Sequence, residues 1–252
     1  MRITQHPVLD QKQGKEVSFT FDGRPMVGRE GEMVSSALFA NGIRTFSRHK
    51  VGDAPQGIFC ANGQCAQCTV LIDGLPLKSC ITPLQEGMEI RTLIHYPELP
   101  EDDQLRPSHP PLELSCQVLV VGAGPSGITA AIELADAGYS VILVDDKDHL
   151  GGKLVLQTHK FFGSMADCYA GTRGTEIAKI LEAEARQREN ITIMTDAVVA
   201  GLYSDGRAGI YQANQERYLL VSFDGVIVAA GARERSLVFP GNDLPGVFGA
   251  GA

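Results

Sequence analysis

The segment Gln117-Val-Leu-Val-Val-Gly-Ala-Gly-Pro-Ser-Gly127 joins an apolar run to a glycine-rich turn. Its glycines follow the G-x-G-x-x-G pattern of dinucleotide-binding loops, in which they permit a tight turn, a close backbone approach to a pyrophosphate, and close packing of helix on strand. A helix expected over residues 126–136 would point its N-terminal N–H groups at the phosphates. The segment therefore predicts nucleotide contacts from Gly122, Gly124, Pro125, Ser126 and Gly127.

Three later features favour FAD as the nucleotide. An apolar run over residues 141–144 predicts a second strand, and Asp145 after it is placed to bond ribose hydroxyls, with Asp146 the weaker candidate. Gly152 belongs to a Gly-Gly pair, and Gly231 ends a run that resembles a later strand of two-dinucleotide-binding flavoproteins, although Ala230 stands where those proteins usually have threonine. We expect FAD contacts from Asp145, Gly152 and Gly231. A Rossmann-like loop that binds nothing is the alternative.

Strand and helix patterns alternate through this half of the chain, which predicts an α/β Rossmann-like FAD-binding domain over residues 116–252. The apolar strand at 117–121 is continuous, as in a strand buried on both faces. The strands are expected at 117–121, 141–144, 191–194, 198–203, 209–211, 218–223 and 226–231, and the helices at 126–136 and 175–189.

Four cysteines precede this half at C-x4-C-x2-C…C spacing: Cys60, Cys65, Cys68 and Cys80. The spacing is a variant of the plant-type [2Fe–2S] pattern, with a shorter gap before the last cysteine. Glycines within the loop let the backbone wrap closely and point N–H groups at the sulfurs. Zinc is the alternative, but zinc sites favour paired C-x2-C knuckles, and only one pair has that spacing. We predict the four cysteines as ligands of a [2Fe–2S] cluster.

The residues around these cysteines predict an α+β, β-grasp ferredoxin-like domain over residues 1–95. Strands expected at 17–21 and 24–27 are joined by an Asp-Gly turn, and a helix with apolar positions from Met33 to Ala40 ends at Asn41-Gly42. A second hairpin, over residues 69–72 and 75–78, leads into the last cysteine. The acidic, proline-rich residues 96–115 suit an extended linker.

Composition narrows the functional classes. The chain has 252 residues and a formal charge of −8, without a basic stripe, so a nucleic-acid partner is not expected. No apolar run is long enough to span a membrane, and the N-terminus lacks a secretory signal, so we expect a soluble, cytoplasmic protein in which disulfides are disfavoured. Of the two other cysteines, Cys116 is expected to pack in the core and Cys168 to be a small buried thiol.

Both motif sets, together with Gly231-Ala-Arg-Glu-Arg-Ser-Leu-Val-Phe-Pro-Gly-Asn-Asp-Leu-Pro-Gly246, resemble the α-subunit family of heteromeric amine and imino-acid dehydrogenases. This family includes heterotetrameric sarcosine oxidase, dye-linked proline and hydroxyproline dehydrogenases, opine oxidases and hydrogen cyanide synthase. The resemblance implies FAD and a [2Fe–2S] cluster as cofactors. It also implies other subunits as partners, among them a β-type flavoprotein that carries the site for an amino or imino acid.

One departure from this family concerns the FAD site. Members of the family continue past the segment ending at Gly246 into a second nucleotide-binding domain and a returning FAD segment. The resemblance therefore implies that the FAD-binding domain is incomplete here, as part of a longer polypeptide or completed by another subunit. Residues 116–252 alone are expected to hold FAD weakly.

Three functions stay open at this point. The leading one is an FAD/[2Fe–2S] oxidoreductase or electron-transfer subunit of an amino- or imino-acid dehydrogenase, for proline, hydroxyproline, sarcosine or a similar donor. The second is an NAD(P)H-dependent flavin/iron–sulfur reductase subunit. The third is a non-catalytic, tethered ferredoxin module. No paired carboxylates or Ser/His/Asp set appear, so the redox chemistry is expected to come from the cofactors and no catalytic residue is named.

Overall fold

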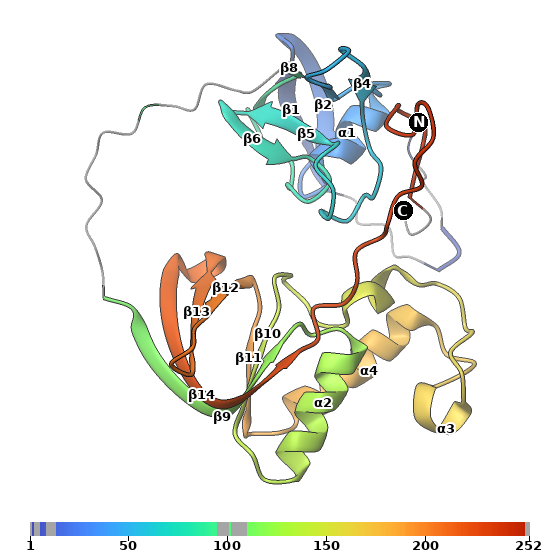
Figure 1. Cartoon of the computed structure of the whole chain (residues 1–252). Coiled ribbons are helices and arrows are strands. Elements are labelled where there is room, and N and C mark those ends of the chain that lie inside the picture. Colours follow the sequence, from blue (N-terminus) through green and yellow to red (C-terminus); the bar gives the residue numbers. More distant parts are fainter. Residues whose placement is uncertain (1, 3–5, 9–13, 95–100, 102–109, 250–252) are drawn as a thin grey trace. The chain divides into compact units, whose positions relative to one another are not determined.

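The computed structural model describes residues 2, 6–8, 14–94, 101 and 110–249 (Figure 1). The chain divides into two compact units, one formed by residues 1–105 with 233–252 and the other by residues 106–232. The expected FAD-binding domain extends to residue 252, but the second unit ends at residue 232. The residues that follow it, 233–252, belong to the first unit. Within that unit, the Gly249 N–H donates to the Phe59 carbonyl at 2.9 Å.

The first unit contains a five-stranded sheet in the order β2-β1-β7-β5-β6. The predicted hairpins are confirmed as β1 (Glu16–Phe21) with β2 (Arg24–Arg29), and β5 (Thr69–Ile72) with β6 (Leu75–Lys78). Central β7 (Glu89–Arg91) was not predicted from the sequence; it runs parallel to β1 and antiparallel to β5. A smaller sheet has the order β4-β3-β8, from β3 (Ser47–Arg48), β4 (Pro55–Gln56) and β8 (Leu93–Ile94).

Helix α1 (Val34–Ala40) supplies the predicted helix of this β-grasp unit. It ends where expected, since Gly42 adopts a left-handed φ of 84° and the Asn41 side-chain amide donates to the Ala37 carbonyl at 2.8 Å. Its buried face packs with residues of the main sheet and the loops in one apolar cluster, which includes Val34, Leu38, Phe46, Leu84 and Ile90.

The second unit is built on a six-stranded sheet in the order β11-β10-β9-β14-β13-β12. Strands β9, β10, β11 and β14 are parallel, whereas β12 and β13 are joined antiparallel to the β14 edge. Their bounds are β9 (Leu112–Val121), β10 (Val141–Val144), β11 (Ile191–Met194), β12 (Ala197–Leu202), β13 (Arg207–Gln212) and β14 (Arg217–Val228).

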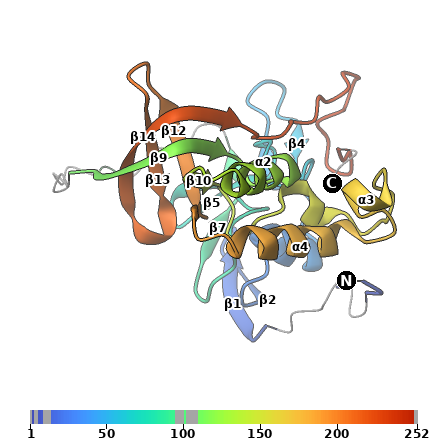
Figure 2. The ribbon, with the colours of Figure 1, turned by 90° about the horizontal axis from the view of Figure 1, so that it is seen from below.

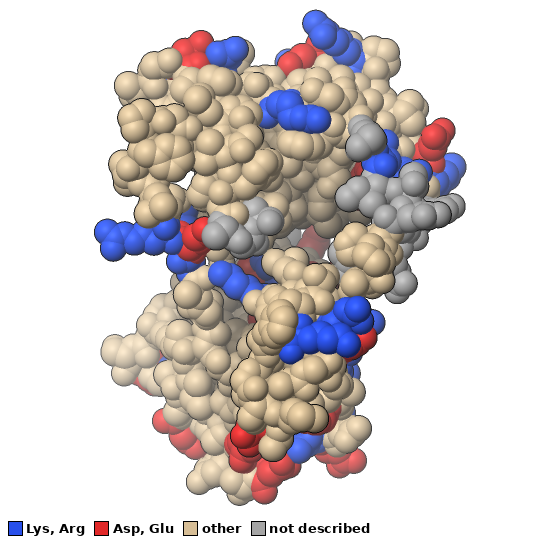
Figure 3. Space-filling view, turned by 90° about the vertical axis from the view of Figure 1, so that its right-hand side faces the viewer, with Lys and Arg blue, Asp and Glu red and all other residues tan. Residues whose placement is uncertain are grey.

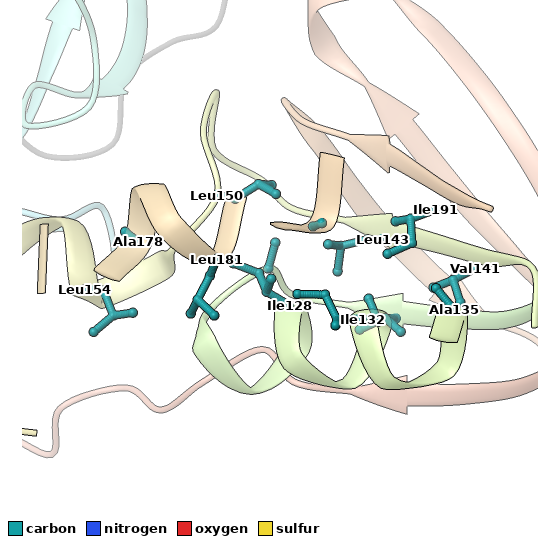
Figure 4. Packing of buried hydrophobic residues seen from close by; sticks show 14 of the residues in the cluster. Ile128, Ile132, Ala135, Val141, Leu143, Leu150, Leu154, Ala178, Leu181 and Ile191 are labelled. Atoms are coloured by element: carbon teal, nitrogen blue, oxygen red, sulfur yellow. The ribbon is translucent and has the colours of Figure 1, made fainter. Parts of the chain in front are cut away.

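Helices α2 (Pro125–Asp136) and α4 (Gly174–Arg186) lie side by side against one face of this sheet (Figure 2). Between them and the sheet lies a buried apolar cluster, to which Ile128 and Ile132 of α2 and Leu181 of α4 contribute (Figure 4). The apolar spacing that predicts these helices is therefore the spacing that buries them. Two short elements lie between β10 and α4, the 3-10 helix η1 (Gly152–Leu156) and α3 (Met165–Cys168).

Strand boundaries correct three sequence predictions. Strand β9 begins at Leu112, so residues 112–115 are strand and not linker. The strands expected at 218–223 and 226–231 form one continuous β14, which ends at Val228. The cause is pairing, since β14 lies parallel to β9 from Leu219↔Leu112 to Val228↔Val121. The rest of the expected linker is outside the described residues except for residues 101, 110 and 111.

None of the helices in the described parts of the chain is both long and apolar enough to cross a membrane.

Candidate cofactor sites

The cysteine loop lies between β4 and β5, and Cys80 follows β6. Cys60, Cys68 and Cys80 are buried and Cys65 is partly buried. The backbone turns sharply inside the loop, with positive φ at Ala61 and Gly63. These turns bring N–H groups to the sulfurs: Gly63 N–H lies 3.3 Å from Cys80 Sγ, and Cys65 N–H lies 3.3 Å from Cys60 Sγ. Such N–H groups stabilise thiolates.

The hairpin and the loop are fixed to each other by polar contacts. Lys78 Nζ donates to the Gly63 carbonyl at 2.7 Å, and Ser79 Oγ donates to the Cys68 carbonyl at 2.7 Å. The last cysteine therefore reaches the loop from a rigid strand end.

The four thiols are arranged as two pairs, Cys60 with Cys65 and Cys68 with Cys80. A hydrogen bond from the Cys80 thiol lowers the pKa of Cys68 to about 6, even though burial opposes ionisation. The same bond, together with burial, raises the pKa of Cys80. In the other pair burial is the largest influence: it raises the pKa of Cys65, whereas nearby backbone N–H groups outweigh it and lower the pKa of Cys60.

Two thiol pairs fit a [2Fe–2S] cluster, which takes four cysteines for two irons. A mononuclear zinc site instead needs its thiolates around one point. The arrangement therefore fits the binuclear cluster that the cysteine spacing predicts.

The glycine loop connects β9 to α2, and two of its glycines cannot carry a side chain. Gly122 has φ 101°, and a Cβ there would lie 2.5 Å from the Ala229 carbonyl oxygen. A Cβ at Gly127 would lie 1.8 Å from the Gly122 carbonyl oxygen. At Gly124, in contrast, a Cβ would meet nothing within 4 Å. That open space borders the N-terminus of α2, where Pro125 is the first residue, Ser126 the second, and no side chain caps the helix.

Open space at Gly124 and an uncapped helix N-terminus fit the diphosphate of a dinucleotide. The helix offers N–H groups and a partial positive charge. The first glycine permits the predicted tight turn, and the third permits the start of α2 to pack closely on the turn and on Ala229.

Asp145, directly after β10, is buried, and its carboxylate forms a hydrogen bond with the glycine loop. Its Oδ2 accepts from the Ala123 N–H at 2.6 Å and its Oδ1 accepts from the Lys147 N–H at 3.0 Å. Burial raises the pKa of Asp145, and these two N–H groups oppose the rise. Each oxygen has a second lone pair that a ribose hydroxyl could use. Asp146 is exposed and pairs with Lys147 Nζ at 2.8 Å.

Gly152 and Gly231 lie in the two loops at the same edge of the sheet. A Cβ at Gly152 would lie 2.9 Å from the Gly124 Cα, so this glycine permits direct contact between loops. Gly231 has φ 72° and open space around its Cα. Sequence reasoning did not single out Lys153, whose Nζ donates to the Ala232 carbonyl at 2.9 Å. The sequence feature that could have identified this residue is its position directly after the Gly-Gly pair.

The two remaining cysteines differ from each other. Cys116 is buried in the core and burial raises its pKa, which confirms the packing role. Cys168 is exposed, so the prediction of a buried thiol is wrong. It ends the four-residue helix α3, in which no residue is buried.

Lysine and arginine are scattered over the face shown in Figure 3 and form no continuous basic surface there. This agrees with the acidic composition.

Each half of the chain matches a known protein family. Residues 14–94 match the family described as "2Fe-2S iron-sulfur cluster binding domain", and residues 116–250 match "Pyridine nucleotide-disulphide oxidoreductase". The two matches indicate a [2Fe–2S] cluster and FAD as the cofactors.

Individual relatives match the whole chain or its second half. Sarcosine oxidase subunit alpha of Corynebacterium sp. (strain P-1) is 30% identical over 98% of this chain, which spans 27% of that protein. Hydrogen cyanide synthase subunit HcnB of Pseudomonas protegens is 35% identical over 53% of this chain, corresponding to 28% of HcnB. The crystal structure of L-proline dehydrogenase from P. horikoshii has the same fold, with a TM-score of 0.77 at 24% sequence identity. The match covers 97% of this chain and 46% of the proline dehydrogenase chain. The chain thus spans about a quarter of the sarcosine oxidase and cyanide synthase subunits.

Proposed function

Because the chain belongs to the pyridine nucleotide-disulphide oxidoreductase family and carries a [2Fe–2S] cluster binding domain before it, we propose that it is the electron-transfer subunit of an amino- or imino-acid dehydrogenase complex. The donor is an amino or imino acid such as sarcosine, proline or hydroxyproline. The observation that carries the proposal is the presence of both cofactor domains on one chain, in an order that aligns with sarcosine oxidase subunit alpha over 98% of the chain.

Cys60, Cys65, Cys68 and Cys80 are the proposed cluster ligands. Their two hydrogen-bonded pairs, and the N–H groups of Cys65 and Gly63 at the sulfurs, support this assignment. Burial of Cys60, Cys68 and Cys80 keeps water away from the cluster, and the N–H groups offset the negative charge of the thiolates.

The proposed FAD contacts are Gly122, Gly124, Pro125, Ser126, Gly127, Asp145, Gly152 and Gly231. The open space beside Gly124 and the uncapped start of α2 support a diphosphate position, and the lone pairs of Asp145 support a ribose position. When bound, FAD accepts electrons in pairs and a [2Fe–2S] cluster passes them on singly. The contribution of the chain is to hold both groups and to set their electrostatic surroundings.

The partner is proposed to be a β-type flavoprotein that carries the substrate site. The support is that the relatives are themselves named as subunits, of sarcosine oxidase and of hydrogen cyanide synthase. We place the complex in the cytoplasm, where thiols stay reduced and available to iron.

The donor can be identified by anaerobic reduction of the FAD-loaded complex. Addition of sarcosine or proline is expected to bleach the flavin absorbance at least about tenfold faster than NADH, because the C–N bond of an amino or imino acid is the proposed source of electrons. Stopped-flow absorbance at the flavin band is the measurement, with acetate as an amine-free control.

Two outcomes would contradict the proposal. Rapid bleaching of the chain by NADH would favour an NAD(P)H-dependent reductase. A purified complex with cluster absorbance but without a flavin band would favour a tethered ferredoxin module.

A further inference from the structure

Lys153 connects the two loops that flank the glycine loop. On one side, Gly152 touches the glycine loop so closely that a Cβ would lie 2.9 Å from the Gly124 Cα. On the other side, Ala229 lies against Gly122, where a Cβ would be 2.5 Å from the Ala229 oxygen. The Lys153 ammonium donates to the Ala232 carbonyl at 2.9 Å and so joins the outer ends of both loops.

This position is at the carboxyl edge of three neighbouring parallel strands. β9, β10 and β14 end at Val121, Val144 and Val228, and their registers align these ends. Ligands of open α/β sheets bind outside this edge, and here the open space beside Gly124 lies there too. Lys153 therefore belongs to the rim of the proposed nucleotide site.

The acidic residues around the rim would repel a bound diphosphate unless a cation lay nearby. The loop after β10 carries Asp145, Asp146 and Asp148, while Lys147 is paired with Asp146 and His149 with Asp148. A diphosphate adds further negative charge to this acidic loop. The N-terminus of α2 supplies only about half a positive charge. An ammonium has three donors, of which the bond to Ala232 uses one.

We infer that Lys153 is a diphosphate-binding residue of the FAD site, held in place by the Ala232 carbonyl and neutralising the phosphates of the nucleotide. The inference rests on the proposed FAD-binding function. The Lys153 side chain can have two roles. Its charge can attract the phosphates, and its hydrogen bond to Ala232 can hold the two loops together. Only the first role depends on the phosphates of the ligand.

The test uses the full chain with its cluster reconstituted and compares ADP with adenosine by calorimetric titration. Lys153→Gln removes the charge but keeps a hydrogen-bond donor for Ala232, Lys153→Met removes both, and Lys153→Arg keeps both. For Lys153→Gln and Lys153→Met we expect ADP affinity to fall about tenfold, and adenosine affinity to stay within about twofold of the unmodified chain. Lys153→Arg is expected to retain ADP affinity within about threefold.

The control is Lys179→Gln, the same charge change at an exposed position of α4; it is expected to alter neither affinity. Raising the salt concentration should weaken ADP binding to the unmodified chain more than to Lys153→Gln. Equal losses of ADP and adenosine affinity in Lys153→Met, with none in Lys153→Gln, would show that the side chain only holds the two loops together, and would overturn the inference. ADP affinity unchanged in every variant would overturn it as well. An unmodified chain that binds neither FAD nor ADP would overturn the proposed function, and the inference with it.

Discussion

Gly127→Ala is expected to abolish FAD binding and to destabilise the second unit. A Cβ at this position would lie 1.8 Å from the Gly122 carbonyl oxygen, a backbone atom that cannot rotate away. The turn between β9 and α2 must therefore open. Overpacking usually costs about 1–3 kcal/mol of unfolding free energy, and we expect the upper end of this range because backbone has to move. Thermal unfolding followed by circular dichroism and FAD titration by fluorescence give the two readouts.

Gly124→Ala separates binding from folding at the same loop. Its Cβ would meet no atom within 4 Å and its φ of −72° suits alanine, so the unfolding temperature should hardly change. FAD affinity should still fall by about tenfold or more, because the methyl group enters the space proposed for the diphosphate. Gly225→Ala, also in open space but on β14, is the matched control and should leave both properties unchanged. Normal FAD affinity in Gly124→Ala would contradict the proposed diphosphate position.

Replacing any of Cys60, Cys65, Cys68 or Cys80 by alanine is expected to remove the cluster. Each sulfur is one of four proposed donors, and losing even a residue that hydrogen-bonds a metal ligand costs about 10–100-fold in metal affinity. Iron and sulfide content after anaerobic reconstitution should therefore fall by more than about tenfold. The proposed flavin site lies in the other unit, so FAD uptake should persist.

Cys168→Ala is the matched control for these variants, since Cys168 is exposed and belongs to neither thiol pair. It should retain iron and sulfide in full. Loss of the cluster in Cys168→Ala, or its retention in Cys80→Ala, would contradict the proposed ligand set.

The sequence predicts the features that depend on neighbouring residues. The two hairpins are set by Asp22-Gly23 and Asp73-Gly74, whose positive φ values are the conformations such turns require. The glycine loop is predicted because its G-x-G-x-x-G pattern is contained in six consecutive residues, and two of these glycines, Gly122 and Gly127, have no room for a side chain. The cysteine spacing likewise predicts a loop, and the structure adds the pairing of the thiols.

Features that depend on distant residues are the ones the sequence does not reveal. Strand β7 has the residues Glu89, Ile90 and Arg91, of which only the isoleucine is apolar, so it has no strand pattern of its own. It exists because β1 and β5 both pair with it. Strand β9 starts early for the same reason, since β14 supplies a partner for residues 112–115. The contact between Gly249 and Phe59 joins residues 190 positions apart in the chain.

Cys168 shows the limit of reasoning from residue type alone. Cysteine is usually buried, but burial depends on the element that carries the residue. A four-residue helix that buries no side chain leaves this thiol in solvent.

Chemical analysis of the anaerobically reconstituted protein shows whether one chain holds a binuclear iron–sulfur cluster together with a flavin. Iron, acid-labile sulfide, zinc and flavin are measured on the same sample. We predict two irons and two sulfides per chain, as in a 2Fe-2S domain, with FAD taken up when it is added in excess. One zinc per chain without sulfide would contradict this prediction, because the chain would then have no iron–sulfur carrier to take electrons from the flavin.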